Sequence, residues 1–154
     1  MAIDFYTAKE GSAFCWRVQL ALEYKGLDYR PRPLDLAIQE HKAPQFLKLT
    51  PRGQLPCLRD GDYVVFESIA ILYYLDRKYP QPPIFGTSAE EGGVILRVIE
   101  EFQHFIEPHL AATVAAITGP RARAQHESAL EHLVRVAGEA RTIEGRLARS
   151  EWVV

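Results

Sequence analysis

The sequence predicts an α/β domain with a mixed sheet, followed by an all-α region. Over about the first 80 residues, β-favouring runs and apolar-faced helical segments alternate in the order β-α-β-α-β-β-α, the pattern of a mixed sheet covered by helices. Prolines and glycines then cluster at residues 80–93, and beyond them the apolar pattern is helical. We therefore expect a domain at residues 1–80, a linker at 81–92 and a partial helical domain with two long helices at 93–154.

The first three elements are predicted between residues 3 and 34. Residues 3–7 favour a strand. A helix is predicted after Ser12, ending near Gly26, because apolar residues recur there at helical spacing. These apolar residues are Phe14, Val18, Ala21 and Leu22. Residues 29–34 favour a second strand, and its two prolines place it at a sheet edge.

The remaining elements of this domain surround a hairpin. A short helix is predicted at residues 43–49, ended by a proline and a glycine. Strands at 57–59 and 63–66 flank the sequence Asp60-Gly61-Asp62, a hairpin turn signal. Residues 68–79 form an apolar-faced segment and are predicted to be the third helix.

The region after the linker predicts two long helices. Pro108 lies inside the first apolar pattern and should kink that helix. Gly119-Pro120 separates it from a second helix at about residues 121–149, whose arginines alternate with glutamates and so predict a solvated face. The last residues, 152–154, are apolar, whereas a free terminus is usually polar. We therefore expect the helical domain to be cut short.

Composition argues against several classes of function. The net charge of −2 gives no electrostatic basis for binding nucleic acid. No apolar run approaches the roughly 18 residues of a membrane span, so no membrane association is expected. The two cysteines and five histidines lack metal-ligand spacing, so we expect no metal site. We expect a cytoplasmic protein with reduced thiols.

The stretch from Gln54 to Leu75 combines groups that suit a zwitterionic, peptide-like ligand. Leu55 precedes a proline and is therefore extended, so its backbone can pair with a ligand backbone. Ser68 at a helix start suits a carboxylate, and Glu67 suits an ammonium group. In the simpler interpretation, Ser68 only caps the helix and Glu67 only favours its dipole.

Ser12 has the same two interpretations. A serine before a helix usually serves as its N-cap. Its hydroxyl could instead donate to an anion held at the positive end of the helix, where the pKa of a thiol is lowered. Such a site would stabilise a thiolate without a general base.

Three segments, in this order and with this spacing, resemble motifs of the glutathione transferases. Residues 12–22 resemble the serine-type first-helix motif, 51–58 the segment with a cis-proline, and 66–71 the γ-glutamyl-binding motif. The resemblance covers residues 3 to about 79, and the helical remainder resembles the start of the family's C-terminal domain.

This resemblance implies a thioredoxin-like first domain that binds glutathione, as part of a homodimer. Ser12 would hydrogen-bond the thiolate and Pro56 would be the cis-proline. Leu55 would pair with the cysteinyl unit through its backbone. The remaining residues expected to bind glutathione are Phe14, Lys42, Gln54, Glu67 and Ser68, with His41 near the glycyl end.

The resemblance leaves rival assignments open. Tyr6 is the rival of Ser12, because some branches use a tyrosine at the end of the first strand. Cys15 would suggest a cysteine-type branch with thiol-disulfide chemistry, whereas Cys57 is expected to be a buried core residue. The electrophile pocket is expected between the domains. Phe105, Ile106 and His109 are its candidates, although core packing is the better expectation for each.

The leading functional hypothesis is conjugation of glutathione to small hydrophobic electrophiles. A glutathione-dependent isomerase of a small dicarboxylic acid is a second hypothesis, but its Ser-Ser-Cys segment is replaced here by Ser12-Ala13-Phe14-Cys15. A thiol-disulfide oxidoreductase and a non-enzymatic glutathione-binding module are two further hypotheses.

Overall fold

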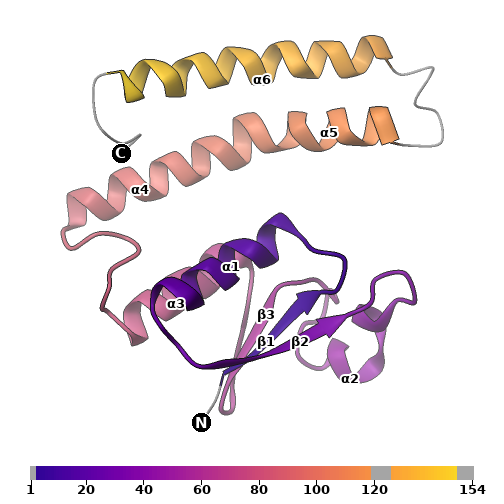
Figure 1. Ribbon diagram of the computed structural model, residues 1–154, viewed down its shortest axis with the longest axis vertical. Helices are drawn as coiled ribbons and strands as arrows, with labels where there is room; N and C mark the ends of the chain where they lie inside the picture. The colour runs from indigo at the N-terminus through magenta and orange to yellow at the C-terminus, as the bar shows by residue number, and fades with distance from the viewer. Residues whose placement is uncertain (1–2, 119–125, 149–154) are drawn as a thin grey trace. The chain divides into compact units, whose positions relative to one another are not determined.

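The computed structural model describes residues 3–118 and 126–148, and the chain forms two compact units, residues 1–84 and 85–154. The first unit contains a sheet and three α-helices, and the second is helical (Figure 1). The order of elements in the first unit is the predicted β-α-β-α-β-β-α, so the predicted fold class is confirmed. The two units are described separately below.

The sheet of the first unit is four-stranded and mixed, with the order β2-β1-β3-β4. Its strands are β1 (Ile3–Ala8), β2 (Tyr29–Leu34), β3 (Cys57–Asp60) and β4 (Tyr63–Phe66). β1 runs parallel to β2 and antiparallel to β3, and β3 pairs antiparallel with β4. β2 lies at the edge that its prolines predicted, since proline cannot donate a ladder hydrogen bond.

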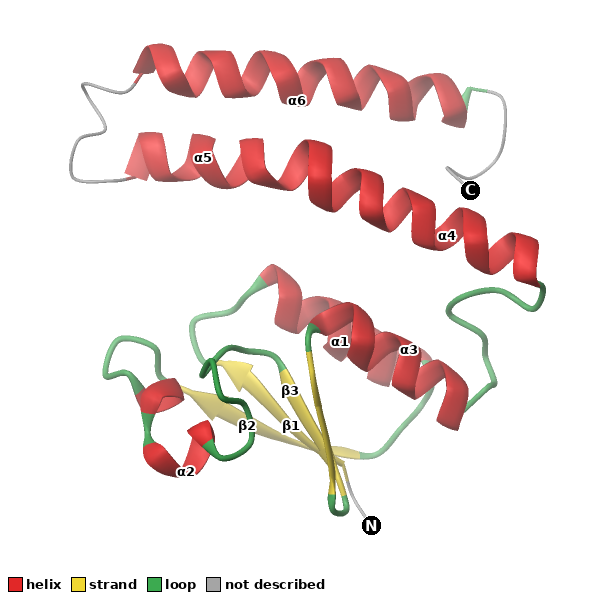
Figure 2. Cartoon of the chain, turned by 180° about the vertical axis from the view of Figure 1, so that it is seen from behind, coloured by secondary structure: helices red, strands yellow, loops and turns green. Residues whose placement is uncertain are grey.

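Helices cover the sheet unequally. α1 (Ala13–Tyr24) and α3 (Ser68–Lys78) lie side by side over one face, and the short α2 (Pro44–Leu47) lies on the other side (Figure 2). Side chains alternate between the faces along β1. Phe5 is therefore buried toward α1, while Tyr6 packs on Phe46 of α2, with ring centroids 5.5 Å apart. The main core lies between the sheet and the two long helices, with Val18, Leu22, Leu58, Ile71 and Leu75 fully buried.

The C-terminal ends of α1 and α3 are joined by a buried lysine. The Lys25 ammonium donates to Asp76 Oδ1 at 3.0 Å, to the Tyr79 carbonyl at 2.7 Å and to the Pro82 carbonyl at 2.6 Å. Asp76 Oδ1 also accepts the Ile84 backbone N–H at 2.7 Å. The sequence suggests Lys25 only as part of a helix stop. In the structure, Lys25 and Asp76 together hold the last residues of this unit, up to Ile84, against α1 and α3.

The helical unit begins earlier than the sequence predicts. α4 (Ala89–Glu101) starts four residues before the expected position at 93. Ser88 accepts a hydrogen bond from the Glu91 N–H and Glu91 accepts one from the Ser88 N–H, which is a capping box. Gly92 and Gly93 lie within this helix, although glycine in a helix interior costs about 1 kcal/mol relative to alanine.

The helix that contains Pro108 is interrupted by a π-helical turn just before the proline. α4 passes into a π-helical turn, Phe102–Ile106, which is followed by α5 (Glu107–Thr118). The Glu107 amide donates to the Phe102 carbonyl across this wider turn. A proline ring crowds the carbonyl four residues before it, and a wider turn relieves that crowding. α6 (His126–Leu147) is the second long helix; Gly119-Pro120, Arg121, Arg123, Arg149 and residues 150–154 lie outside the described residues.

Within the described ranges, none of the helices is both long enough and apolar enough to span a bilayer. The same ranges contain no group of three or more histidine, cysteine or acidic side chains placed to hold a metal ion.

Candidate functional site

Ser12 occupies the N-cap position of α1, but its side chain does not cap the helix. Its backbone is extended, its carbonyl accepts the Trp16 N–H at 2.8 Å, and its hydroxyl makes no capping hydrogen bond. The first turn of α1 contains no acidic residue. A half-buried serine therefore stands at the positive end of a helix whose first turn carries no carboxylate to compete with a bound anion.

The start of α3 differs from the simpler interpretation of the sequence. The N-cap is Glu67, not Ser68, and the Glu67 side chain makes no capping hydrogen bond. Glu67 has a φ of 68°, a left-handed conformation that is unfavourable for a residue with a side chain. Such backbone strain often occurs at ligand sites. Its carboxylate is 64% exposed and lies 3.9 Å from the Arg52 guanidinium.

Ser68 is the first residue of α3 and is 7% exposed. Its Oγ accepts a hydrogen bond from Arg17 Nη1 at 3.1 Å. Arg17 lies in the second turn of α1, and its guanidinium lies 5.6 Å from the centroid of the Phe14 ring. This arginine connects the two helix starts that carry Ser12 and Glu67.

Sequence reasoning did not single out Arg17. The available signal was its position within the first-helix motif, five residues after Ser12. A partner on a helix 51 residues away in sequence cannot be read from that motif.

The Leu55–Pro56 peptide bond is cis, as the resemblance implied. β3 begins at Cys57, so the Leu55 peptide groups lie outside the strand ladder. Leu55 is half-buried and Pro56 is buried.

Lys42 lies near Gln54 and fastens the loop before it. The Lys42 ammonium donates to the carbonyls of Arg52 at 2.8 Å and Gly53 at 3.2 Å, leaving one of its three N–H donors for a ligand. Gly53 has a φ of 55°, and a Cβ there would collide with the His41 carbonyl. The imidazole Nδ1 of His41 is buried without a hydrogen-bond partner among the described residues. Gln54 is exposed, so its side chain can reach a ligand.

The two rivals of Ser12, Tyr6 and Cys15, have different surroundings. The Tyr6 ring packs at a tilt against Phe46 of α2. Cys15 is fully buried and belongs to the core, so it cannot act as an exposed nucleophile. Burial raises the pKa of the Cys57 thiol to about 11, which agrees with its expected role as a core residue.

The three candidates for the electrophile pocket have different environments within the helical unit. Ile106 is buried, as core packing predicts, but Phe105 is 56% exposed, which contradicts core packing for that residue. Both line a hollow of about 290 Å³ between the π turn and α6. His109 Nδ1 lies 2.9 Å from His132 Nδ1 and so joins α5 to α6.

Known proteins resemble this chain in sequence. Residues 6–77 match the family model of the glutathione S-transferase N-terminal domain. Glutathione S-transferase Z2 of Arabidopsis thaliana is 38% identical over 112 residues, which cover 69% of this chain and 50% of that protein. Maleylacetoacetate isomerase of Pseudomonas aeruginosa is 39% identical over 90 residues, covering 54% and 42% respectively.

A solved structure extends the similarity beyond the first domain. The crystal structure of a glutathione S-transferase from the Antarctic clam Laternula elliptica superposes with a TM-score of 0.81 at 30% identity. The match covers 98% of this chain and 68% of the clam chain. The chain spans about half or less of the length of the two curated relatives above.

Proposed function

The chain belongs to the glutathione S-transferase family, and from this premise we propose that it binds reduced glutathione as a thiolate and adds it to small hydrophobic electrophiles. The observation that carries this proposal is the uncapped Ser12 hydroxyl at the start of α1, in the same unit as the strained N-cap of α3. Both helix starts offer unpaired backbone N–H groups to an anionic ligand.

Glutathione would be held by groups from three segments. The γ-glutamyl carboxylate would accept from the start of α3, at Ser68, and the Glu67 carboxylate would meet the γ-glutamyl ammonium. The cysteinyl backbone would pair with that of Leu55. The glycyl carboxylate would meet Lys42 and Gln54.

The chemical step needs no acid–base relay. With the thiol proton already lost to solvent, the glutathione sulfur donates an electron pair to an electrophilic carbon and forms the C–S bond. With an aryl halide, the halide leaves with the electron pair of its own bond. Ser12 would donate a hydrogen bond to the thiolate and raise its population, and proximity would supply further rate.

Two measurements on the full chain test this function. Isothermal titration with reduced glutathione is expected to give saturable binding, and 1-chloro-2,4-dinitrobenzene is expected to be conjugated at a rate that saturates with glutathione. Binding without turnover would favour the non-enzymatic module, and absence of binding would contradict the proposal.

An isomerase is the second candidate, because one relative is named maleylacetoacetate isomerase. It would use the same thiolate to add to and leave a carbon–carbon double bond of the substrate. Assaying maleylacetoacetate alongside the aryl halide, each with saturating glutathione, ranks the two activities directly.

Replacing Arg17 by leucine is expected to raise the KM for glutathione about tenfold while changing kcat much less. The substitution leaves the Ser68 hydroxyl without its charged donor, and such hydrogen bonds contribute about 1.5–3 kcal/mol. Steady-state kinetics at varied glutathione concentration measure the effects on KM and on kcat separately. Arg17→Lys should restore part of the affinity for glutathione. A loss of kcat at unchanged KM would contradict this positioning role.

We also propose a homodimer and a cytoplasmic location, as expected from the sequence. The described part of α6 exposes Leu130, Leu133 and Val134, an apolar surface that suits a second copy.

A further inference from the structure

Trp16 is a large aromatic side chain that the core does not use. It lies in the first turn of α1 and is 59% exposed, whereas Cys15 and Val18 on the core side of the same helix are fully buried. An indole ring that stays outside the core contributes little to its packing. What Trp16 does in this fold therefore depends on its contacts at the start of the helix.

The Trp16 ring lies against Gly11, in the loop that joins β1 to α1. Side chains of a helix lean toward its N-terminus, so a ring in the first turn can reach the residues before the helix. A Cβ added to Gly11 would lie 3.0 Å from Trp16 Cζ2, 3.5 Å from Cε2 and 3.6 Å from Nε1. Gly11 has a φ of 88°, a left-handed conformation that glycine adopts without strain. The absence of a side chain at Gly11 therefore lets the indole approach the loop backbone.

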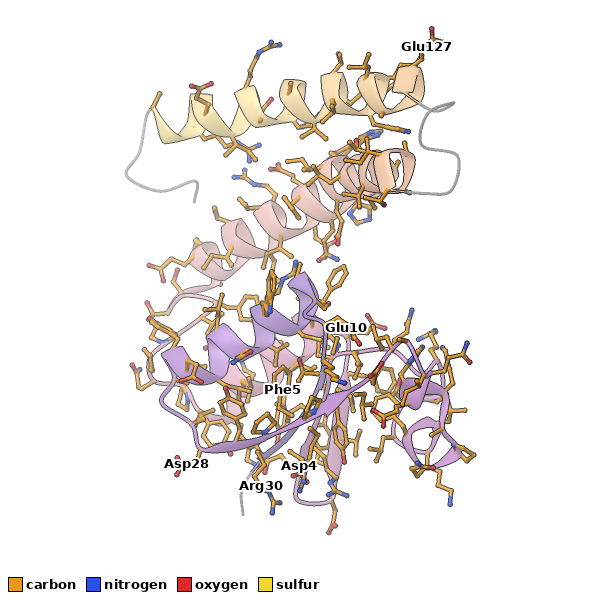
Figure 3. All side chains as sticks on the ribbon, turned by 45° about the vertical axis from the view of Figure 1, so that its right-hand side comes forward. Asp4, Phe5, Glu10, Asp28, Arg30 and Glu127 are labelled. Carbon is orange, nitrogen blue, oxygen red and sulfur yellow. The ribbon has the colours of Figure 1, made fainter. Side chains whose placement is uncertain are left out.

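This loop offers few anchors of its own. Lys9 and Glu10 are exposed, so neither inserts its side chain into the core, and Gly11 has no side chain. Figure 3 shows Glu10 in this loop, next to the start of α1. The ring of Trp16 is therefore well placed to hold the loop from the helix side.

Trp16 contacts the chain both before and after the Cα of Ser12. Its ring packs on Gly11, the residue before, and its backbone N–H donates to the Ser12 carbonyl at 2.8 Å. The Ser12 side chain makes no capping hydrogen bond, so the position of its hydroxyl depends on the backbone that carries it. Holding that backbone on both sides restricts where the hydroxyl can lie.

We propose that Trp16 is a positioning residue for the glutathione thiolate and acts through Gly11 and Ser12. This inference rests on the proposed function, since it needs Ser12 to donate to the thiolate sulfur. The indole would fix the Gly11 backbone and so keep the Ser12 hydroxyl aimed at the sulfur. A preorganised donor needs no rearrangement during the reaction, and a displacement of about 1 Å at such a group can cost about a hundredfold in rate.

The test is Trp16→Ala in the full chain, assayed with glutathione and 1-chloro-2,4-dinitrobenzene. The kcat at saturating glutathione is expected to fall about tenfold, because the Ser12 hydroxyl remains but is no longer held in place. The KM for glutathione is expected to change less than about twofold, because the start of α3 and Lys42 would still hold the two ends of the ligand.

The ultraviolet signal of the bound thiolate gives a readout that a purely structural role would not move. In Trp16→Ala this signal should appear at a pH higher by about half a unit or more than in the unmodified chain. Trp16→Phe keeps an aromatic ring at the helix start and should restore part of kcat and part of the thiolate signal.

Leu20→Ala and Tyr24→Ala are the matched controls. These side chains follow Trp16 at intervals of four residues on the same face of α1, and they are 68% and 59% exposed. They lie one and two turns farther from the loop, so both variants should keep the kcat and the thiolate titration of the unmodified chain. Circular dichroism confirms that each variant is folded.

A double variant shows whether Trp16 acts through Ser12. If it does, Ser12→Ala combined with Trp16→Ala should be no slower than Ser12→Ala alone. Additive losses, or a thiolate titration in Trp16→Ala equal to that of the unmodified chain, overturn this inference and leave the proposed function intact. If Ser12→Ala itself leaves the titration unchanged, the role proposed for Ser12 fails and the inference fails with it.

Discussion

Replacing Ser12 by alanine is expected to lower kcat/KM for conjugation by about a hundredfold while leaving glutathione affinity nearly unchanged. Removal of one preorganised donor to a developing or bound anion costs about 10²–10³ in rate. The Ser12 hydroxyl makes no capping hydrogen bond, so the substitution removes little from the fold itself. The γ-glutamyl and glycyl ends would remain held by α3 and Lys42.

The thiolate itself gives the sharper measurement. A free thiol has a pKa of about 8.5, and a helix N-terminus lowers it. In the unmodified protein, the ultraviolet signal of the glutathione thiolate should therefore appear at a pH well below about 8.5. In Ser12→Ala, the pH at which this signal appears should rise toward about 8.5. Tyr6→Phe should not change the pH at which the thiolate signal appears, since Tyr6 packs on α2. An unchanged titration in Ser12→Ala would falsify the assignment.

The sequence predicts the order of the elements better than the contacts of the candidate site residues. The order of elements and the edge position of β2 follow from local apolar periodicity and from two prolines, which act within their own segment. The cap of α3 lies one residue before the position that the sequence indicates. A left-handed glutamate at the N-cap is imposed by the surrounding fold, and residue preferences give no indication of it.

The same limit explains the groups that the sequence did not reveal. Arg17 acts through a partner 51 residues away in sequence, which no local pattern specifies. Pro108 is visible in the sequence, but its effect depends on whether the preceding turn can widen. Lys25 and Gly26 together indicate a helix stop, and only the packing of α1 on α3 buries the lysine ammonium.

Replacing Lys25 by methionine is expected to destabilise the chain by about 3–5 kcal/mol, a large part of the roughly 5–15 kcal/mol of a typical domain. The Lys25 ammonium is fully buried against an Asp76 carboxylate that is 4% exposed. Without it, that carboxylate keeps the Ile84 N–H but loses the charge of the lysine, and two carbonyls lose their donor. Urea unfolding followed by circular dichroism measures the loss.

Most of this loss of stability should come from the Asp76 carboxylate, which stays buried without its lysine. Removing one partner of a buried ion pair destabilises a protein more than removing both partners. Lys25→Met combined with Asp76→Leu should therefore be more stable than Lys25→Met alone. Lys9→Met is the surface control. Lys9 also pairs with an aspartate, Asp35, at 2.9 Å, but its side chain is 64% exposed. The urea midpoint of Lys9→Met should therefore stay close to that of the unmodified chain. If Lys25→Met unfolds at the same urea concentration as Lys9→Met, the buried pair does not hold the ends of α1 and α3 together.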